Sequence, residues 1–148
     1  MSTKIEKIIE NMSLDELVGQ LMCYNVPISE SEDIAEKFGE LFERTMPGGI
    51  FVHGVTAEQI KTVTELINKH TSVPVIVAGD TEYGPNTIKG STLLPTTMAW
   101  GACDDEKLIE RGGKAMAQIC RSNGMHWSFA PVVDINYIDM STIVEKSI

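Results

Sequence analysis

Apolar residues along the chain recur either at helical spacing or in short continuous runs. Ser13 opens the sequence SLDE, which predicts a capping box with Glu16 and the start of a short helix. This helix leads to a first candidate strand over residues 20–25. Residues 31–45 and 56–70 each place apolar side chains at spacings of three and four, which predicts two helices with one buried face.

Short apolar runs bounded by Gly and Pro predict further strands, over residues 48–54, 73–80 and 125–135. The run at 73–80 is continuously apolar, as is typical of a parallel strand covered on both faces. Before the last run, Asp104 is expected to cap a long helix that extends to about Ser122. Asn123 and Gly124 supply its left-handed stop. The intervening residues 81–100 are rich in Gly, Pro, Thr and Ser and are expected to form a long functional loop.

Four strands that alternate with three helices indicate an α/β fold with a parallel sheet. A (β/α)8 barrel repeats this unit eight times, so the pattern predicts the first half of such a TIM barrel. The length of 148 residues suits one compact unit, and we expect a single partial domain over 1–148. A complete flavodoxin-like domain would also fit this length, but no Gly-rich phosphate loop follows the first strand.

The composition of the chain disfavours several classes of binding partner. The net charge of -9 disfavours nucleic acid, whose phosphates are bound mainly through Lys and Arg. No apolar run approaches membrane-spanning length, and the charged N-terminus does not resemble a signal peptide, so we expect a cytoplasmic protein without membrane contact. Cys23, Cys103 and Cys120 have no CxxC spacing, which predicts reduced thiols and no zinc site; no cofactor is expected.

Acidic residues stand where two predicted strands end. Asp80 ends the third strand and Asp134 the fourth, at the edge where parallel α/β proteins place their sites. Two such carboxylates can serve as the acid and nucleophile of a glycosidase, or each can cap a neighbouring loop. His53, at the end of the second strand, is expected at the rim of the same pocket. By contrast, Trp127 and Phe129 are expected in the core.

His126, on the same predicted strand, is expected to be a hydrogen-bonded structural histidine.

The order of five sequence segments identifies a family resemblance more specifically than any one segment alone. The chain reads MSLDELVGQLM, MPGGIFV, VPVIVAGDTEYG, LLPTTMAWGACDD and GMHWSFAPVVDIN, and this order resembles the N-terminal domain of family 3 glycoside hydrolases. The resemblance covers about Leu14 to Tyr137 and is strongest to β-N-acetylhexosaminidase and β-glucosidase-like members. It implies a hydrolase acting on β-linked glucosides or N-acetylglucosaminides.

The resemblance also implies roles for individual residues. Asp80 matches the aspartate that accepts hydrogen bonds from sugar hydroxyls at the cleavage subsite, and Glu82 lies in the substrate-binding loop after it. Tyr83 stands where many members have glycine, and Lys89 lies near a basic position of that loop. Asp134 matches an aspartate that lines the pocket in a mainly architectural role.

After Tyr137 the chain departs from the family pattern. The sugar-gripping arginine, the Lys-His segment, the acid-base loop and the nucleophile aspartate have no counterpart in it. Because the family reaction proceeds through a covalent glycosyl-enzyme, we assign no catalytic residue and expect a hydrolase fragment that is inactive alone. The alternative is a non-catalytic carbohydrate-binding or assembly module.

Four strands cannot close an eight-stranded barrel, so the inner face of the sheet should meet water. We expect Phe51, Val75, Val77, and Phe129 or its neighbours on that face. An apolar face of this size rarely persists in a monomer. The sequence therefore predicts a homo-oligomer or a complementary C-terminal half as partner, in addition to a sugar or glycoside ligand.

Overall fold

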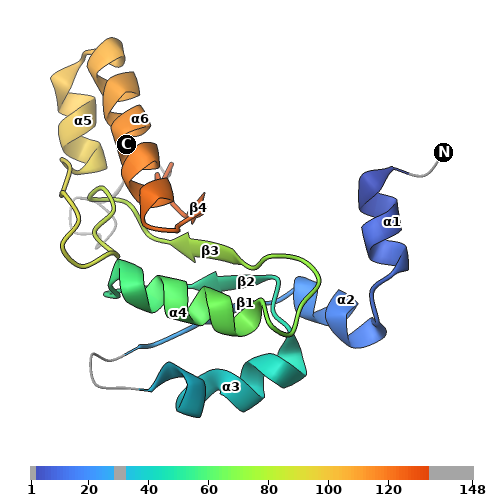
Figure 1. Ribbon diagram of the computed structural model, residues 1–148. Coiled ribbons are helices and arrows are strands. Elements are labelled where there is room, and N and C mark those ends of the chain that lie inside the picture. Colours follow the sequence, from blue (N-terminus) through green and yellow to red (C-terminus); the bar gives the residue numbers. More distant parts are fainter. Residues whose placement is uncertain (1–2, 29–32, 134–148) are drawn as a thin grey trace.

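The computed structural model describes residues 3–28 and 33–133. Its helices are α1 (Lys4–Glu10), α2 (Leu14–Gln20), α3 (Ile34–Thr45), α4 (Ala57–Ile67), α5 (Thr97–Cys103) and α6 (Glu106–Ser122). Its strands are β1 (Cys23–Asn25), β2 (Gly49–Phe51), β3 (Ile76–Gly79) and β4 (Trp127–Ser128). From β1 onward one helix separates successive strands, except that both α5 and α6 lie between β3 and β4; α1 and α2 precede β1 (Figure 1).

The four strands form one parallel sheet in the order β1-β2-β3-β4. Ile50 of β2 pairs with Tyr24 on one side and Val77 on the other, and Ala78 of β3 pairs with Trp127. Sequential parallel order with helical crossovers is the arrangement of a (β/α)8 barrel. The predicted fold, four parallel strands of a partial α/β barrel, is confirmed.

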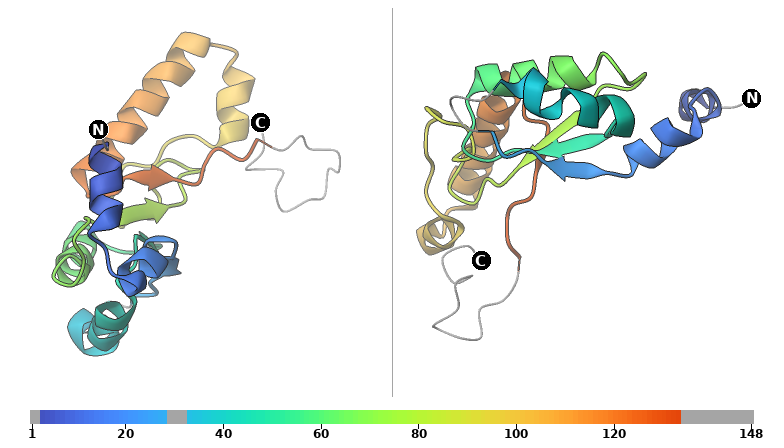
Figure 2. Two further views of the ribbon diagram at one scale, coloured as in Figure 1. Left: turned by 90° about the vertical axis from the view of Figure 1, so that its right-hand side faces the viewer. Right: turned by 90° about the horizontal axis from the view of Figure 1, so that it is seen from below.

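The core lies between the sheet and α3 and α4, which cover the same face (Figure 2). Ile50, Val52 and Val77 point from the sheet into this layer, where Phe38 and Phe42 of α3 stack with ring centroids 5.5 Å apart. Fully burying a side chain of this size contributes about 1.5–3 kcal/mol. This one packed layer therefore carries most of the apolar stabilisation.

The helix starts follow the local sequence closely. Ser13 and Glu16 form the predicted capping box at α2, and Thr56 and Gln59 form another at α4. Asp33 caps α3 through the backbone N–H groups of its first turn. Each box satisfies backbone donors that the first turn of a helix leaves unpaired.

The segment between β3 and α6 differs from the expectation. The last part of the predicted loop forms α5, which Thr96 caps. Asp104 does not start the long helix: it ends α5 with a φ of 49°, and Asp105 caps α6 instead. Asp can adopt the left-handed conformation at modest cost, and this tight link lets α5 fold back beside α6 (Figure 1).

The inner face of the sheet carries Phe51 and Phe129, as predicted, but not Val75 and Val77. Val75 and Val77 are buried on the helix side, whereas Ile76 of β3 is 46% exposed. Trp127 and Phe129 are 51% and 44% exposed, so the expectation that they lie in the core is wrong. Alternate residues of a strand point to opposite faces, and the phase of that alternation places these three side chains on the uncovered side.

Candidate functional site

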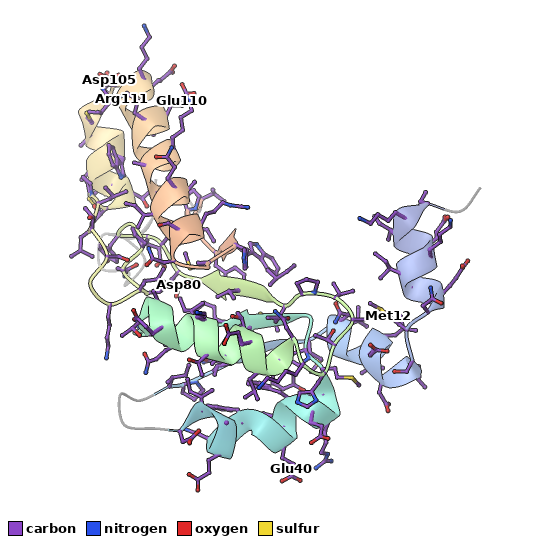
Figure 3. All side chains as sticks on the ribbon, in the orientation of Figure 1. Met12, Glu40, Asp80, Asp105, Glu110 and Arg111 are labelled. Atoms are coloured by element: carbon purple, nitrogen blue, oxygen red, sulfur yellow. The ribbon has the colours of Figure 1, made fainter. Side chains whose placement is uncertain are left out.

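Asp80 immediately follows Gly79, the last residue of β3, and begins the loop toward α5 (Figure 3). Its side chain is half-buried. Within residues 3–28 and 33–133, its carboxylate has no hydrogen bond or ion pair. Partial removal from water makes an unpaired carboxylate costly, so a donor group arriving from outside would be bound favourably.

The two residues after Asp80 join the ends of β3 and β4. Thr81 is buried, and its Oγ1 lies 2.6 Å from Oγ of Ser128, close enough for a hydrogen bond in which either hydroxyl donates. The Ser128 hydroxyl also accepts from the backbone N–H of Ala130 at 3.1 Å. Glu82 is buried beside this link. The backbone that carries Asp80 is thereby held to the neighbouring strand.

A second set of contacts fixes the loop over the end of β2. The backbone N–H of Val55 donates to the carbonyl of Thr87 at 3.1 Å, and that of Lys89 donates to the carbonyl of Val55 at 2.7 Å. Gly84 has a φ of 77°, and a Cβ there would lie 2.8 Å from the backbone nitrogen of Leu94. Only glycine fits this turn without displacing backbone, so the loop has one defined path.

The remaining predicted site residues are placed as follows. His53 is exposed and lies in the turn that follows β2, at the same end of the sheet as Asp80. Asp134 lies outside the described residues. The structure therefore brings Asp80 and Glu82 together on one loop and leaves His53 at the periphery. Their roles in binding stay predictions.

His126, expected to be structural, receives a hydrogen bond at Nδ1 from the backbone N–H of Val77 at 3.2 Å.

A cavity of about 300 Å³ lies between the loop, α5 and α6. Thr81 and Glu82 form part of its wall, and the rest is largely apolar, including Trp100, Ile109 and Met116. Trp100 was not recognised from the sequence because α5 was taken as part of a loop. The sequence feature that could have indicated this contact is the Gly112-Gly113 pair in the long helix. A Cβ on Gly112 would lie 2.7 Å from the Trp100 ring, so glycine makes room for the ring there.

The described part of this site supplies hydrogen-bond acceptors. It does not pair a nucleophile with a general base. Asp80 can accept from hydroxyl groups, which are the recognition groups that a sugar presents. The described residues contain no group of three His, Cys, Asp or Glu side chains placed to hold a metal ion. In the same residues, none of the helices is long and apolar enough to cross a membrane.

Comparison with known proteins points to one family. The family described as "Glycosyl hydrolase family 3 N terminal domain" matches residues 13–148. A β-N-acetylglucosaminidase/β-glucosidase from Cellulomonas fimi is 26% identical over 89% of this chain and 23% of its own length. A β-hexosaminidase from Methylobacillus flagellatus is 28% identical over 68% of this chain and 32% of its own length.

Solved structures agree at the level of the fold. An exo-1,3/1,4-β-glucanase from a Pseudoalteromonas species matches 97% of this chain and 19% of its own, with a TM-score of 0.78 at 23% identity. A β-glucoside phosphorylase bound to 2FGlc matches 91% of this chain and 25% of its own, with a TM-score of 0.75. The chain spans less than a third of the length of these relatives. The chain belongs to glycosyl hydrolase family 3, and residues 13–148 correspond to its N-terminal domain.

Proposed function

We propose that this chain forms the sugar-binding wall of a glycoside hydrolase that acts on β-linked glucosides or N-acetylglucosaminides. In this proposal Asp80 accepts hydrogen bonds from the hydroxyls of the sugar beside the scissile bond. The observation that carries it is the Asp80 carboxylate, half-buried at the end of β3 and without a hydrogen bond or ion pair among the described residues. The named activities of the two curated relatives support this substrate class.

The fixed path of the loop supports the same proposal. Recognition of a sugar requires acceptors that are held in place before binding, because ordering a loose side chain would reduce affinity. Thr81 is tied to β4 and Val55 is tied to Thr87 and Lys89, so the segment around Asp80 is preorganised. Glu82, His53 and Asp134 are proposed as further lining of the pocket.

A complete pocket would need more than the described strands. Four strands surround only part of the mouth of an eight-stranded barrel, so the opposite wall would be formed by segments beyond the described residues. We therefore propose that the site is completed by an oligomer or by a complementary half. The free thiols of Cys23 and Cys103, both exposed, support a reducing compartment such as the cytoplasm.

Binding of N-acetylglucosamine and of glucose, followed by NMR of the 15N-labelled chain, tests this proposal. We expect shifts centred on Asp80 and Glu82, and loss of at least about tenfold in affinity in Asp80→Asn, since a hydrogen bond to a charged group contributes about 1.5–3 kcal/mol. Asp104→Asn is the matched control, because Asn also tolerates the left-handed conformation at that position.

Equal binding by the wild type and Asp80→Asn would sink the assigned role of Asp80. Shifts confined to Trp100 and Met116 would instead place the ligand in the cavity between α5 and α6.

A further inference from the structure

Both backbone groups of Val77, in β3, bind to one residue at the start of the neighbouring strand. The Val77 carbonyl accepts a hydrogen bond from the backbone N–H of His126 at 2.8 Å, and the Val77 N–H donates to Nδ1 of the His126 imidazole at 3.2 Å. We call these two bonds the His126 contact. In a regular parallel pair the Val77 donor would bind a backbone carbonyl of the next strand. A titratable side chain therefore takes the place of a backbone acceptor just before β4.

The Val77 N–H depends on this acceptor. Val77 is fully buried, and its N–H makes no other hydrogen bond within residues 3–28 and 33–133. A buried backbone donor that loses its acceptor is costly. His126 itself is exposed, so its imidazole can exchange protons with the solvent. The pairing of a buried donor is thus controlled by a group that responds to the pH outside.

The chemistry of imidazole gives the direction of this control. A neutral ring accepts a hydrogen bond at Nδ1 only when its proton is on Nε2. In the imidazolium both ring nitrogens carry hydrogen, so Nδ1 cannot accept and its N–H would oppose the N–H of Val77. Histidine is the side chain whose charge ordinarily changes in the range of about pH 5 to 8. The bond to Nδ1 is therefore present with the neutral ring and lost as falling pH protonates it.

The charged groups around His126 do not replace the lost bond. Glu58 and Lys61 of α4 and Arg121 of α6 line the same groove as the imidazole, and all three are exposed. The strand that carries Val77, Ile76–Gly79, has no titratable side chain. Within the described residues no carboxylate forms an ion pair with His126. The imidazolium therefore loses the contact with Val77 and gains no ion pair there.

We propose that the His126 contact is a pH-sensitive switch: the neutral imidazole holds the start of β4 against β3, and protonation releases it. Two residues further on, the Ser128 hydroxyl lies 2.6 Å from Oγ1 of Thr81, which follows Asp80 directly. Release of β4 would loosen this link, so the loop that carries Asp80 loses order in mild acid. The inference goes beyond sugar binding and does not rest on it, and its test uses no sugar.

NMR of the imidazole nitrogens in the 15N-labelled full chain tests the switch without any substitution. At about pH 7.5 we expect the tautomer with the proton on Nε2. On acidification the His126 titration and the Val77 amide shift should have the same midpoint. Val52 is the internal control, because its N–H donates to the carbonyl of Ala78 at 2.9 Å, where no side chain takes part. The Val52 amide should not follow that midpoint.

Amide hydrogen exchange measures how firmly the contact holds. Between about pH 7.5 and 5.5 the protection of Val77, corrected for intrinsic exchange, should fall at least about tenfold, since a buried donor then lacks an acceptor. His126→Asn should abolish this fall, because the Asn side-chain oxygen accepts a hydrogen bond and does not titrate. His70→Asn is the matched control: His70 is half-buried, and its side chain makes no hydrogen bond among the described residues. It should keep the wild-type fall.

Several outcomes would overturn the proposal. A proton on Nδ1 of His126 at neutral pH would make the ring a donor there. A Val77 amide that does not follow the His126 titration would show that another group is its acceptor. An equal fall of protection in His126→Asn and wild type would assign the pH effect elsewhere. If His126→Asn does not fold, as judged by circular dichroism, the two wild-type midpoints still decide.

The amides of Thr81 and Ser128 test the consequence for the candidate site. Both should shift with the same midpoint as Val77, because β4 carries the Ser128 hydroxyl that holds Thr81. A response at Val77 with none at Thr81 and Ser128 would exclude the coupling between the switch and the loop of Asp80.

Discussion

The two faces of the sheet differ in burial although their residues alternate along the same strands. On the helix side, Ile50, Val52 and Val77 are fully enclosed by α3 and α4. On the other side, Ile76 and Phe129 remain substantially exposed. The contrast shows that α3 and α4 enclose one face of this sheet, whereas the other face, here called the open face, has the composition of a core and is left largely uncovered by the described residues.

The difference separates folding from function in this molecule. The enclosed face supplies the burial that holds β1 to β3 against the helices. The candidate site lies at the ends of the strands, where the open face leaves it with one wall. Substitutions on the enclosed face should therefore change mainly the free energy of unfolding. Ligand binding should depend mainly on the segments that cover the open face.

The largest expected effect comes from truncating the enclosed face. Phe42→Ala should lower the free energy of unfolding by about 3–5 kcal/mol, because Phe42 is fully buried and the cavity cannot refill. Ile76→Ala, measured by urea denaturation at concentrations where the chain is monomeric, should cost less than about 1.5 kcal/mol since only part of its surface is buried. Equal losses would show that the open face is packed in solution even in the monomer.

A smaller loss of stability is expected from substituting a glycine within the helices. A Cβ on Gly19 would collide with the backbone carbonyl oxygens of Thr45 and Met46, so Gly19→Ala should cost about 1–3 kcal/mol by forcing α2 away from the end of α3. Gly39→Ala is the control: nothing lies within 4 Å of its Cβ position in α3, and alanine there should stabilise by about 0.5–1 kcal/mol. Thermal melts of both variants would measure the difference in stability. An unchanged stability in Gly19→Ala would show that α2 and α3 can move apart without cost.

The smallest effect should be local to a helix start and independent of either face. The N–H and hydroxyl of Ser13 donate to Glu16 at 3.0 and 3.1 Å and hold the pKa of Glu16 below its ordinary value. A lowered folded-state pKa gives stability that is present above the ordinary pKa and is lost as pH falls through the lowered one. The start of α2 should therefore fray at acid pH.

NMR amide shifts of Ser13 across an acid titration would follow this fraying. The control is the capping box at α4, where Gln59 takes the place of the acid and should show no such titration. Glu16→Gln should remove the dependence at α2. Parallel changes at both boxes would assign the effect to global unfolding.

Much of the fold was determined by local sequence. The capping residues Ser13 and Thr56 act on backbone groups two or three positions away, so their effect can be recognised without knowledge of the rest of the chain. The placement of Asp80 was also predictable, because an apolar run that stops at a charged residue marks the end of a buried strand. The resemblance of the segments to family 3 enzymes then predicted a sugar-binding role for this carboxylate.

Only the tertiary structure decided which strand residues face the helices. The run from Val75 to Val77 is apolar at every position, so its sequence contains no alternation from which the phase could be read, and Ile76 rather than its neighbours faces outward. Trp100 likewise gained its place in the cavity wall only through the packing of α5 on α6. Local sequence fixes which backbone groups a residue can satisfy, but burial depends on segments far apart in the chain, and these meet only in the folded protein.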